Sequence, residues 1–178
     1  MEVLAEKPKE KQPTVYCILS NFRDIKEILK NLSIYNPINS VNSVNSVNIV
    51  YGDLGVSSVH FDTAERGFSF RFDGPLDMRL DLANPLTAKS LINSLEYDKM
   101  AEIFRVYGDE PKAGYLTKKI LEARKIRPIE TTKELSDIVI KISREALPRV
   151  FQALRIAVND EFGALQTMLA DASDMLVS

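Results

Sequence analysis

The chain has 178 residues, of which 45% are hydrophobic and 27% charged, and its net charge is −2; this composition indicates a soluble globular protein with one domain or two small ones. Because it has one cysteine and one histidine, a disulfide framework and a Cys/His zinc cluster within this chain are excluded, and we expect no metal and a reducing cytoplasm. We expect no membrane association, because the sequence shows neither a long charge-free apolar run nor a signal peptide.

Charge is unevenly distributed along the chain. Residues 51–110 hold 11 acidic and 6 basic side chains, whereas residues 112–155 hold 11 basic and 5 acidic ones. A basic segment of this kind is compatible with nucleic-acid binding. A set of solvated helix faces would give the same pattern, and on charge alone it is the better interpretation.

The first third of the chain predicts part of an α/β unit. Residues 1–13 are polar and are expected to form a disordered tail. The apolar run at residues 15–19 predicts a strand, and Asn21 can cap a helix that follows it. A strand followed by a short helix favours an α/β arrangement. In residues 38–48 a Val-Asn-Ser triplet repeats; because asparagine and serine favour turns, we interpret this stretch as a surface insert.

A second buried strand is predicted at residues 47–51, and it is followed by Gly52, Asp53 and Gly55. Ligands of open α/β sheets bind beyond the carboxyl ends of the strands, which makes Asp53 the best single candidate for a site residue. The alternative is a turn or capping aspartate, which is common at such junctions.

The stretch from residue 51 to residue 81 is dense in acidic residues, arginines, glycines and aromatic residues. Loops of this composition often serve a site, because charges are rarely buried without a partner. The alternative is a solvated connection held by salt bridges, and composition alone leaves the two interpretations even.

Helices are predicted over the remainder of the chain. Thr87 and Asp98 can each cap a helix, and a third helix with a basic face ends before Pro128. Thr131 opens a fourth helix with a capping box, and Pro148 suits the first turn of a long final helix. The apolar stripe of that final helix would comprise Phe151, Leu154, Val158, Phe162, Leu165, Leu169, Ala172 and Leu176.

Several segments resemble one known family, in sequence and in order. They are DLGVSS at residues 53–58, AERGFSFRFDGPLDMR at 64–79, YGDE at 107–110, RPIETTKEL at 127–135 and FQALRIAVNDE at 151–161, preceded by the pair Asn21-Phe22. They are similar to segments of the bacterial small-subunit ribosomal RNA cytosine-N4 methyltransferases, the MraW family. The order of the residues in this resemblance favours the interpretation of residues 51–81 as a site loop.

The resemblance implies an enzyme that uses S-adenosyl-L-methionine to methylate the N4 amine of a cytosine in small-subunit ribosomal RNA, with the small ribosomal subunit as its partner. It implies the fold class α/β, with a Rossmann-like core that is incomplete here because the chain supplies two strands at most. The chain is then mostly α. A homodimer is compatible with this interpretation.

The same resemblance implies a division of the chain. We expect a partial core at residues 14–58, a site loop with a helical substrate-recognition insert at 59–147, and a long helix at 148–178 that returns to the core. The family's glycine-rich loop before Asp53 and its later Phe-His-Ser-Leu-Glu-Asp segment have no counterpart in this sequence. We therefore expect the chain to correspond to the middle of such an enzyme.

Cofactor and catalytic residues are implied in the same way. Phe22, Asp53 and His60 occupy cofactor-contact positions of the family, with His60 in place of the usual glutamine. A histidine can still donate one hydrogen bond. Our hypothesis is that Asp53, Ser57 and Ser58 line the catalytic pocket and accept the hydrogens of the cytosine amine.

For the RNA substrate, we predict contacts with basic and aromatic side chains. The basic candidates, which would contact phosphates, are Arg66, Arg79, Lys118, Lys119, Arg124 and Lys125. Phe68, Phe70 and Phe72 could stack on bases, and local packing within the loop is the alternative for these rings. The competing functions are an RNA-binding helical module without catalysis and an inactive remnant.

Overall fold

The computed structural model describes residues 3–5, 15–34, 47–52 and 55–176. The chain divides into two compact units, Met1–Asp53 with Phe162–Ser178 and Leu54–Glu161. The described part is mostly helical and has one two-stranded sheet, which confirms the expected mostly-α character. The Rossmann-like core stays a prediction, as do the domain boundaries.

The first unit contains the sheet. Strand β1 (Val3–Ala5) pairs antiparallel with β2 (Tyr16–Ile18), with Val3 opposite Ile18. The predicted strand at residues 15–19 is thus confirmed. By contrast, residues 3–5 were expected in a disordered tail; the short apolar run Val-Leu-Ala finds a hydrogen-bonding partner in β2 and forms a strand instead.

A short helical segment follows the sheet. The 3-10 helix η1 (Phe22–Asp24) is capped by Asn21, whose side chain accepts a hydrogen bond from the Arg23 amide at 3.1 Å, and it leads into α1 (Ile25–Asn31). The capping role predicted for Asn21 is therefore confirmed.

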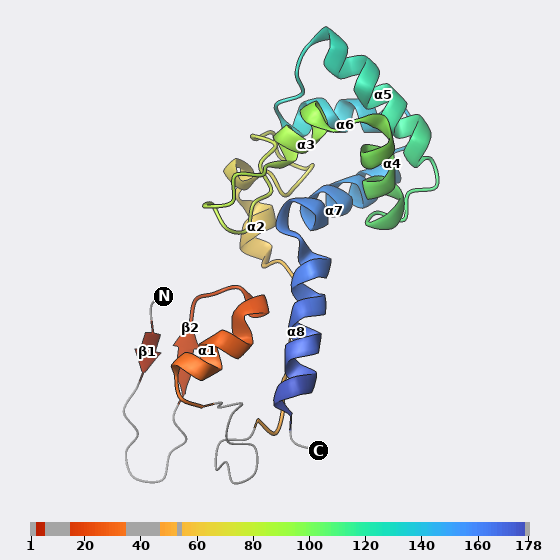
Figure 1. Cartoon of the computed structure of the whole chain (residues 1–178). Helices are drawn as coiled ribbons and strands as arrows, with labels where there is room; N and C mark the ends of the chain where they lie inside the picture. The colour runs from red at the N-terminus through yellow and green to blue at the C-terminus, as the bar shows by residue number, and fades with distance from the viewer. Residues whose placement is uncertain (1–2, 6–14, 35–46, 53–54, 177–178) are drawn as a thin grey trace. The chain divides into compact units, whose positions relative to one another are not determined.

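Helix α8 (Glu161–Met175) lies beside α1 in the first unit (Figure 1). The Lys26 ammonium on α1 contacts the carboxylates of Asp174 at 2.8 Å and Asp171 at 3.5 Å. The hydrogen bond to Asp174 raises the pKa of Lys26. These contacts join two segments that lie at opposite ends of the sequence.

The second buried strand predicted at residues 47–51 is not formed. Val47 makes only an isolated parallel bridge to Leu176, and Ile49 and Tyr51 are 82% and 89% exposed. A strand is buried only where neighbouring strands and covering helices surround it, and the described residues supply a single bridge. Most of the insert predicted at residues 38–48, and Asp53 itself, lie outside the described residues.

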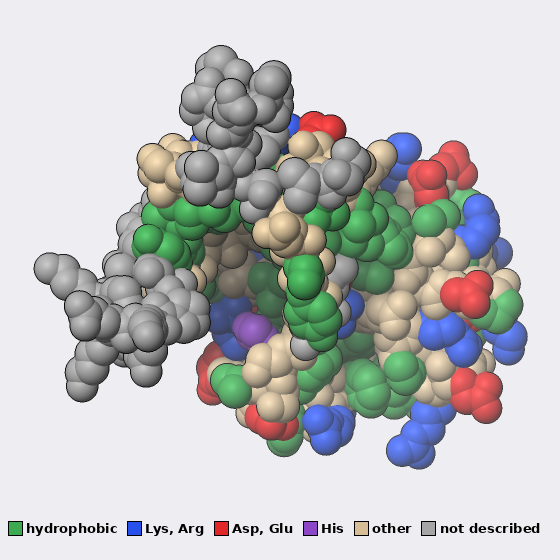
Figure 2. Space-filling view, turned by 90° about the horizontal axis from the view of Figure 1, so that it is seen from below, with side chains coloured by type: hydrophobic (Ala, Val, Ile, Leu, Met, Phe, Trp, Pro, Cys, Tyr) green, Lys and Arg blue, Asp and Glu red, His purple; other side chains and the backbone are tan. Residues whose placement is uncertain are grey.

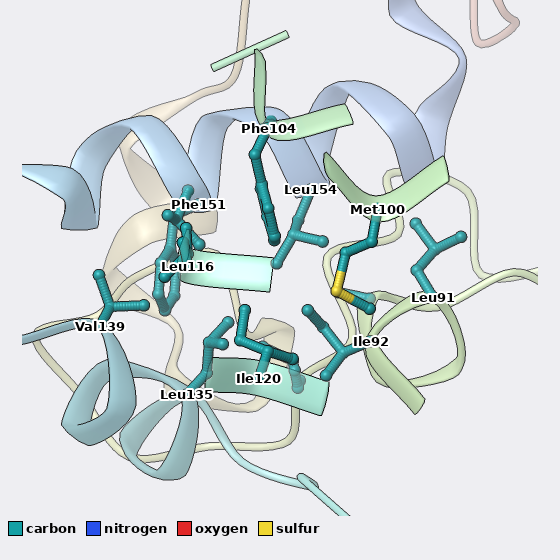
Figure 3. Packing of buried hydrophobic residues seen from close by; sticks show 14 of the residues in the cluster. Leu91, Ile92, Met100, Phe104, Leu116, Ile120, Leu135, Val139, Phe151 and Leu154 are labelled. Carbon is teal, nitrogen blue, oxygen red and sulfur yellow. The ribbon is translucent and has the colours of Figure 1, made fainter. Parts of the chain in front are cut away.

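The second unit is helical. Its elements are α2 (Ser58–Asp62), η3 (Ala64–Arg66), α3 (Ala88–Ser94), α4 (Tyr97–Val106), α5 (Ala113–Ile126), α6 (Thr132–Ile140) and α7 (Ala146–Asn159). Helices α3 to α7 gather into one bundle (Figure 1). Their inward-facing apolar residues form a single core (Figure 3).

The core draws its largest side chains from several helices. Phe104 of α4, Leu116 and Ile120 of α5 and Leu154 of α7 converge in it (Figure 3), each at most 1% exposed. Burying a side chain of this size contributes about 1.5–3 kcal/mol. The helical spacing of apolar residues predicted these helices, so their formation is a local consequence of the sequence.

The capping box predicted at Thr131 is present, and Thr87, predicted only as a helix cap, also forms one. The Thr87 hydroxyl accepts a hydrogen bond from the Ser90 amide at 3.1 Å, and the Ser90 side chain accepts one from the Thr87 amide. Thr131 and Glu134 form the same reciprocal pair at the start of α6. Asp98, predicted to cap α4, instead lies in its first turn.

The final helix predicted to start near Pro148 is broken. Asp160 adopts a left-handed conformation (φ 47°) between α7 and α8. Asn84 donates a hydrogen bond to the Val158 carbonyl at 2.8 Å, and Asn159 donates one to the Met78 carbonyl at 2.8 Å. The helix end is thus held by side chains of its own and of the preceding loop.

The break changes which face of the following helix is buried. On α8 the buried residues are Ala164, Met168, Ala172 and Met175. Phe162 and Leu169, which the continuous apolar stripe would bury, are 51% and 57% exposed. The prediction of one uninterrupted stripe is therefore wrong at Phe162, Leu169 and Leu176, whereas Ala172 is buried as predicted.

Candidate functional site

The loop between η3 and α3 is bonded into the second unit along its length. The Leu76 amide donates to the Glu130 carbonyl at 2.9 Å, and the Ala88 amide donates to the Asp77 carbonyl at 2.8 Å. The Thr132 hydroxyl donates to the Phe72 carbonyl at 2.7 Å. The loop has no regular secondary structure of its own, yet helices α3 and α6 fix its path.

Two glycines allow this path. Gly67 has φ 70°, and a Cβ there would overlap the carbonyl oxygen of Pro75. A Cβ on Gly74 would overlap the carbonyl oxygen of Ala64. Only glycine permits both the left-handed backbone and such close approach.

Asp77 and Arg79 form a salt bridge inside the loop. The Arg79 Nε and Nη2 groups each donate to one Asp77 carboxylate oxygen at 2.9 Å, and Nη1 donates to the carbonyls of Leu82 and Asn84 at 2.8 Å. The hydrogen bond from Arg79 lowers the pKa of Asp77. Four of the five N–H donors of Arg79 are thus used within the loop, and its predicted contact with RNA stays a prediction.

Arg66 supports the same turn. Its guanidinium donates to the carbonyl of Arg79, and the Arg66 carbonyl accepts a hydrogen bond from the Met78 amide at 3.0 Å. Met78 is fully buried with φ 63°, a conformation that costs about 1–2 kcal/mol for a residue with a side chain. The contacts of Arg66 therefore help to hold the loop in a strained backbone conformation. A role of Arg66 in RNA binding stays a prediction.

The three phenylalanines of the loop have different surroundings. Phe68 is 3% exposed and belongs to the core, whereas Phe70 and Phe72 are 38% and 44% exposed. The rings of Phe70 and of Phe151 on α7 pack edge to face, with their centroids 5.4 Å apart. Local packing is therefore the correct interpretation for Phe68, and stacking on a base remains open to Phe70 and Phe72.

Ser57, Ser58 and His60 lie at and within α2. The Ser57 side chain accepts a hydrogen bond from the Val59 amide at 3.4 Å, and Ser58 is exposed. The His60 ring lies 5.2 Å from that of Phe68, and its Nδ1 atom is buried without a hydrogen-bond partner among the described residues. An unpaired ring nitrogen leaves this side chain able to bond a ligand.

The remaining cofactor candidates are in the other unit. Phe22 is 37% exposed at the start of η1, and Asp53 is outside the described residues. Ser58 and His60 therefore lie on one short helix, and Ser57 is its N-cap. Their association with Phe22 and Asp53 stays a prediction.

The basic residues of α5 are divided between internal bonds and solvent. Lys119 pairs with Glu122 at 2.7 Å, which raises the pKa of Lys119. Arg124 donates to the Ile92 carbonyl at 2.7 Å. Lys118 and Lys125 are exposed and have no ion pair among the described residues. On the face of the molecule shown in Figure 2, basic and acidic side chains are interspersed.

A buried ion pair that we did not predict joins α7 to the turn after α4. The Glu110 side chain is 1% exposed; it accepts a hydrogen bond from Arg149 Nε at 2.7 Å and one from the Lys112 amide at 3.0 Å. A Cβ on Gly108 would lie 2.6 Å from the Arg149 carbonyl oxygen. The segment YGDE thus serves the packing of α4 against α7.

A pocket of about 390 Å³ opens beside Phe70 in the second unit. It is lined by Phe61, Phe68, Ser69, Phe70, Arg71, Pro148, Phe151, Gln152 and Arg155. Sequence reasoning missed the contributions of α2 and α7, because they meet the loop only in the folded chain. In the sequence, only the phenylalanines of the loop pointed to this pocket.

Comparison with known proteins relates these segments to one family. The model of the MraW methylase family matches residues 1–178. A ribosomal RNA small subunit methyltransferase H from Picosynechococcus is 49% identical over 71% of this chain and 46% of its own length, and one from Chlorobium chlorochromatii is 40% identical over 99% of this chain and 55% of its own length. A protein of that name from Legionella pneumophila is 45% identical over 70% of this chain and 42% of its own length.

The chain spans about half the length of the curated relatives that it matches. Within its described residues, no helix has the length and apolar character needed to cross a membrane. The match to the family model extends over the whole sequence and includes the loop, the Glu110 turn and α7. This chain belongs to the MraW methylase family.

Proposed function

We propose that this chain takes part in methylation of the N4 amine of a cytosine in small-subunit ribosomal RNA, with S-adenosyl-L-methionine as methyl donor. The observation that carries the proposal is the family match over residues 1–178, together with relatives named ribosomal RNA small subunit methyltransferase H. The cytoplasm is the location we propose, and the small ribosomal subunit is the partner. A homodimer stays a prediction.

Two of the candidate cofactor residues have side chains whose own surroundings suit a ligand. The buried, unpartnered Nδ1 of His60 suits a hydrogen bond to a polar ligand, and the part-exposed ring of Phe22 suits contact with a flat one. We assign these two residues and Asp53 to the donor site. When bound, S-adenosyl-L-methionine supplies an electrophilic methyl group.

The protein's task is then to position the amine. Holding two reactants in line can lower a barrier by roughly 7–11 kcal/mol, so alignment matters more than a strong base. We assign Asp53, Ser57 and Ser58 to the amine: an acceptor on its hydrogens localises the nitrogen lone pair for attack. Transfer of the methyl group to N4 would release one proton from the amine, and we assign the Asp53 carboxylate as its acceptor.

Methyl transfer by the chain tests this proposal directly. We expect the 178-residue chain, incubated with methyl-labelled S-adenosylmethionine and small ribosomal subunits that lack the modification, to place label in N4-methylcytidine, identified by chromatography of the digested RNA. Asp53→Asn should reduce the rate by about 100-fold, because it removes the charged proton acceptor. Binding of RNA without label in N4-methylcytidine would instead identify an RNA-binding module without catalysis.

The exposed lysines of α5 are assigned to phosphate contacts. We expect Lys118→Gln with Lys125→Gln to weaken RNA binding and to reduce the slope of log K against log salt concentration by about 1.5–2, because each phosphate contact contributes nearly one unit. Fluorescence anisotropy over a salt series measures this slope. Lys99→Gln on α4, which removes an exposed lysine paired only loosely with Glu102 at 3.5 Å, is the control and should leave the slope as it is. An unchanged slope in the double variant would remove α5 from the RNA interface.

A further inference from the structure

The pocket beside Phe70 has a chemistry that the proposed function does not use. Its lining side chains include four phenylalanines and two arginines but no acidic residue. The residues come from α2, the loop and α7, all within the second unit. A volume of about 390 Å³ lies within the range of small-ligand sites.

The walls of the pocket are flat and apolar. Phe70 presents its ring at 78° to that of Phe151, in edge-to-face contact, so the two rings form adjoining walls. Phe61 of α2 and Phe68, which is 3% exposed, also line the pocket. Aromatic walls of this kind accept an unpaired nucleobase by stacking.

The polar side chains that line the pocket have hydrogen-bonding capacity left for a ligand. Arg71 is 63% exposed, and its nearest acidic partner, Asp62, is 3.9 Å away. Arg155 uses Nε and Nη2 for Glu161 at 2.8 and 3.0 Å, which leaves Nη1. Two cations suit a phosphate group. The Gln152 amide nitrogen donates to the Tyr107 carbonyl at 3.2 Å, so its oxygen can accept from a base.

We propose that this pocket binds one unpaired nucleotide of the RNA, adjacent in sequence to the cytosine that is methylated. The inference rests on the proposed function for the identity of the RNA. None of the residues assigned to the donor or to the amine lines the pocket, which is why we assign it to a neighbour of the target base. Phe61 lies on the same short helix as Ser58, and this proximity suits a nucleotide next to the target. An apolar peptide would use the aromatic walls but not the two arginines.

Base stacking in the pocket can be measured with 2-aminopurine, whose fluorescence is quenched when it stacks. We expect an oligoribonucleotide of small-subunit sequence, carrying 2-aminopurine next to the target cytosine, to be quenched by the full chain on one side of the cytosine. Phe70→Leu should abolish the quenching and weaken binding by about 5- to 150-fold, as measured for loss of one stacked base.

Tyr97→Leu is the control. Tyr97, on α4 of the same unit, is an aromatic residue of comparable exposure that does not line the pocket; this variant should retain both quenching and affinity. Arg71→Gln gives an independent test that leaves the aromatic walls intact. It should keep the quenching and lower the salt dependence of binding by one phosphate contact. Thermal melting of each variant checks that the helical unit is folded.

The results separate this inference from the proposed function. Quenching that depends on Phe70 supports the pocket even if no label reaches N4-methylcytidine. Quenching that is absent with the unaltered chain, or equal in the Phe70→Leu and Tyr97→Leu variants, overturns the pocket assignment even if methyl transfer is observed. Competition by an apolar peptide but not by RNA would also overturn it, in favour of a protein ligand.

Discussion

Gly67→Ala is expected to destabilise the helical unit by roughly 2–5 kcal/mol, which is the sum of a left-handed backbone penalty and a steric overlap. Gly67 has φ 70°, and its added Cβ would meet backbone atoms of Pro75 and Asp77. Backbone atoms cannot rotate away as the end of a flexible side chain can. Denaturant unfolding followed by far-ultraviolet circular dichroism measures the change in free energy.

Gly55→Ala provides the comparison. Gly55 is exposed, and no heavy atom lies within 4 Å of the Cβ position. We expect this variant to unfold within about 0.5 kcal/mol of the unaltered chain. Equal stability of the two variants would show that the loop does not keep, in solution, the backbone conformation that requires Gly67.

A second large loss of stability is expected for Arg149→Met. This substitution leaves the Glu110 carboxylate, 1% exposed, without its cationic partner. Loss of one partner of a buried pair costs about 3–5 kcal/mol. We expect about 3 kcal/mol, the lower end, because the Arg149 side chain is itself 35% exposed and water can reach the site. The same unfolding measurement applies.

The double variant Glu110→Gln with Arg149→Met separates the effect of the unpaired Glu110 charge from the effect of lost arginine packing. A neutral amide can still accept the hydrogen bond that the Lys112 amide gives to Glu110, and it avoids a buried unpaired charge. We therefore expect the double variant to be more stable than Arg149→Met alone. A double variant that is as unstable as, or less stable than, the single one would mean that packing of the arginine stem, not the ion pair, holds the turn.

The features of the fold that the sequence predicted are local ones. Thr131 lies three residues before Glu134, its partner in the predicted capping box, and Thr87 directly precedes α3, which it was predicted to cap. Both signals are visible within one helical turn. The helices α3 to α6 follow from apolar residues at helical spacing and from Pro128 after α5. The motif order in the loop likewise led to the family.

The features that sequence reasoning missed depend on distant residues. Glu110 and Arg149 are 39 positions apart, and neither stands out in sequence as buried. The strand predicted at residues 47–51 needs neighbouring strands that the described residues do not supply. The break at Asp160 is stabilised by Asn84 and by contacts of Asn159 with the loop, which no helical pattern can reveal.

The hydrogen bonds of the loop between η3 and α3 affect the order in which parts of the chain unfold. Its amides at Leu76 and Met78 are bonded to Glu130 and Arg66, outside the loop, and its Asp77 carbonyl accepts from the Ala88 amide of α3. Exchange of these amides with deuterated water therefore requires the bundle itself to open. We expect these irregular residues to exchange as slowly as amides of α6, so that the loop and the helices behave as one cooperative unit. Such a loop would present its ligand groups already ordered and would lose little conformational entropy when RNA binds.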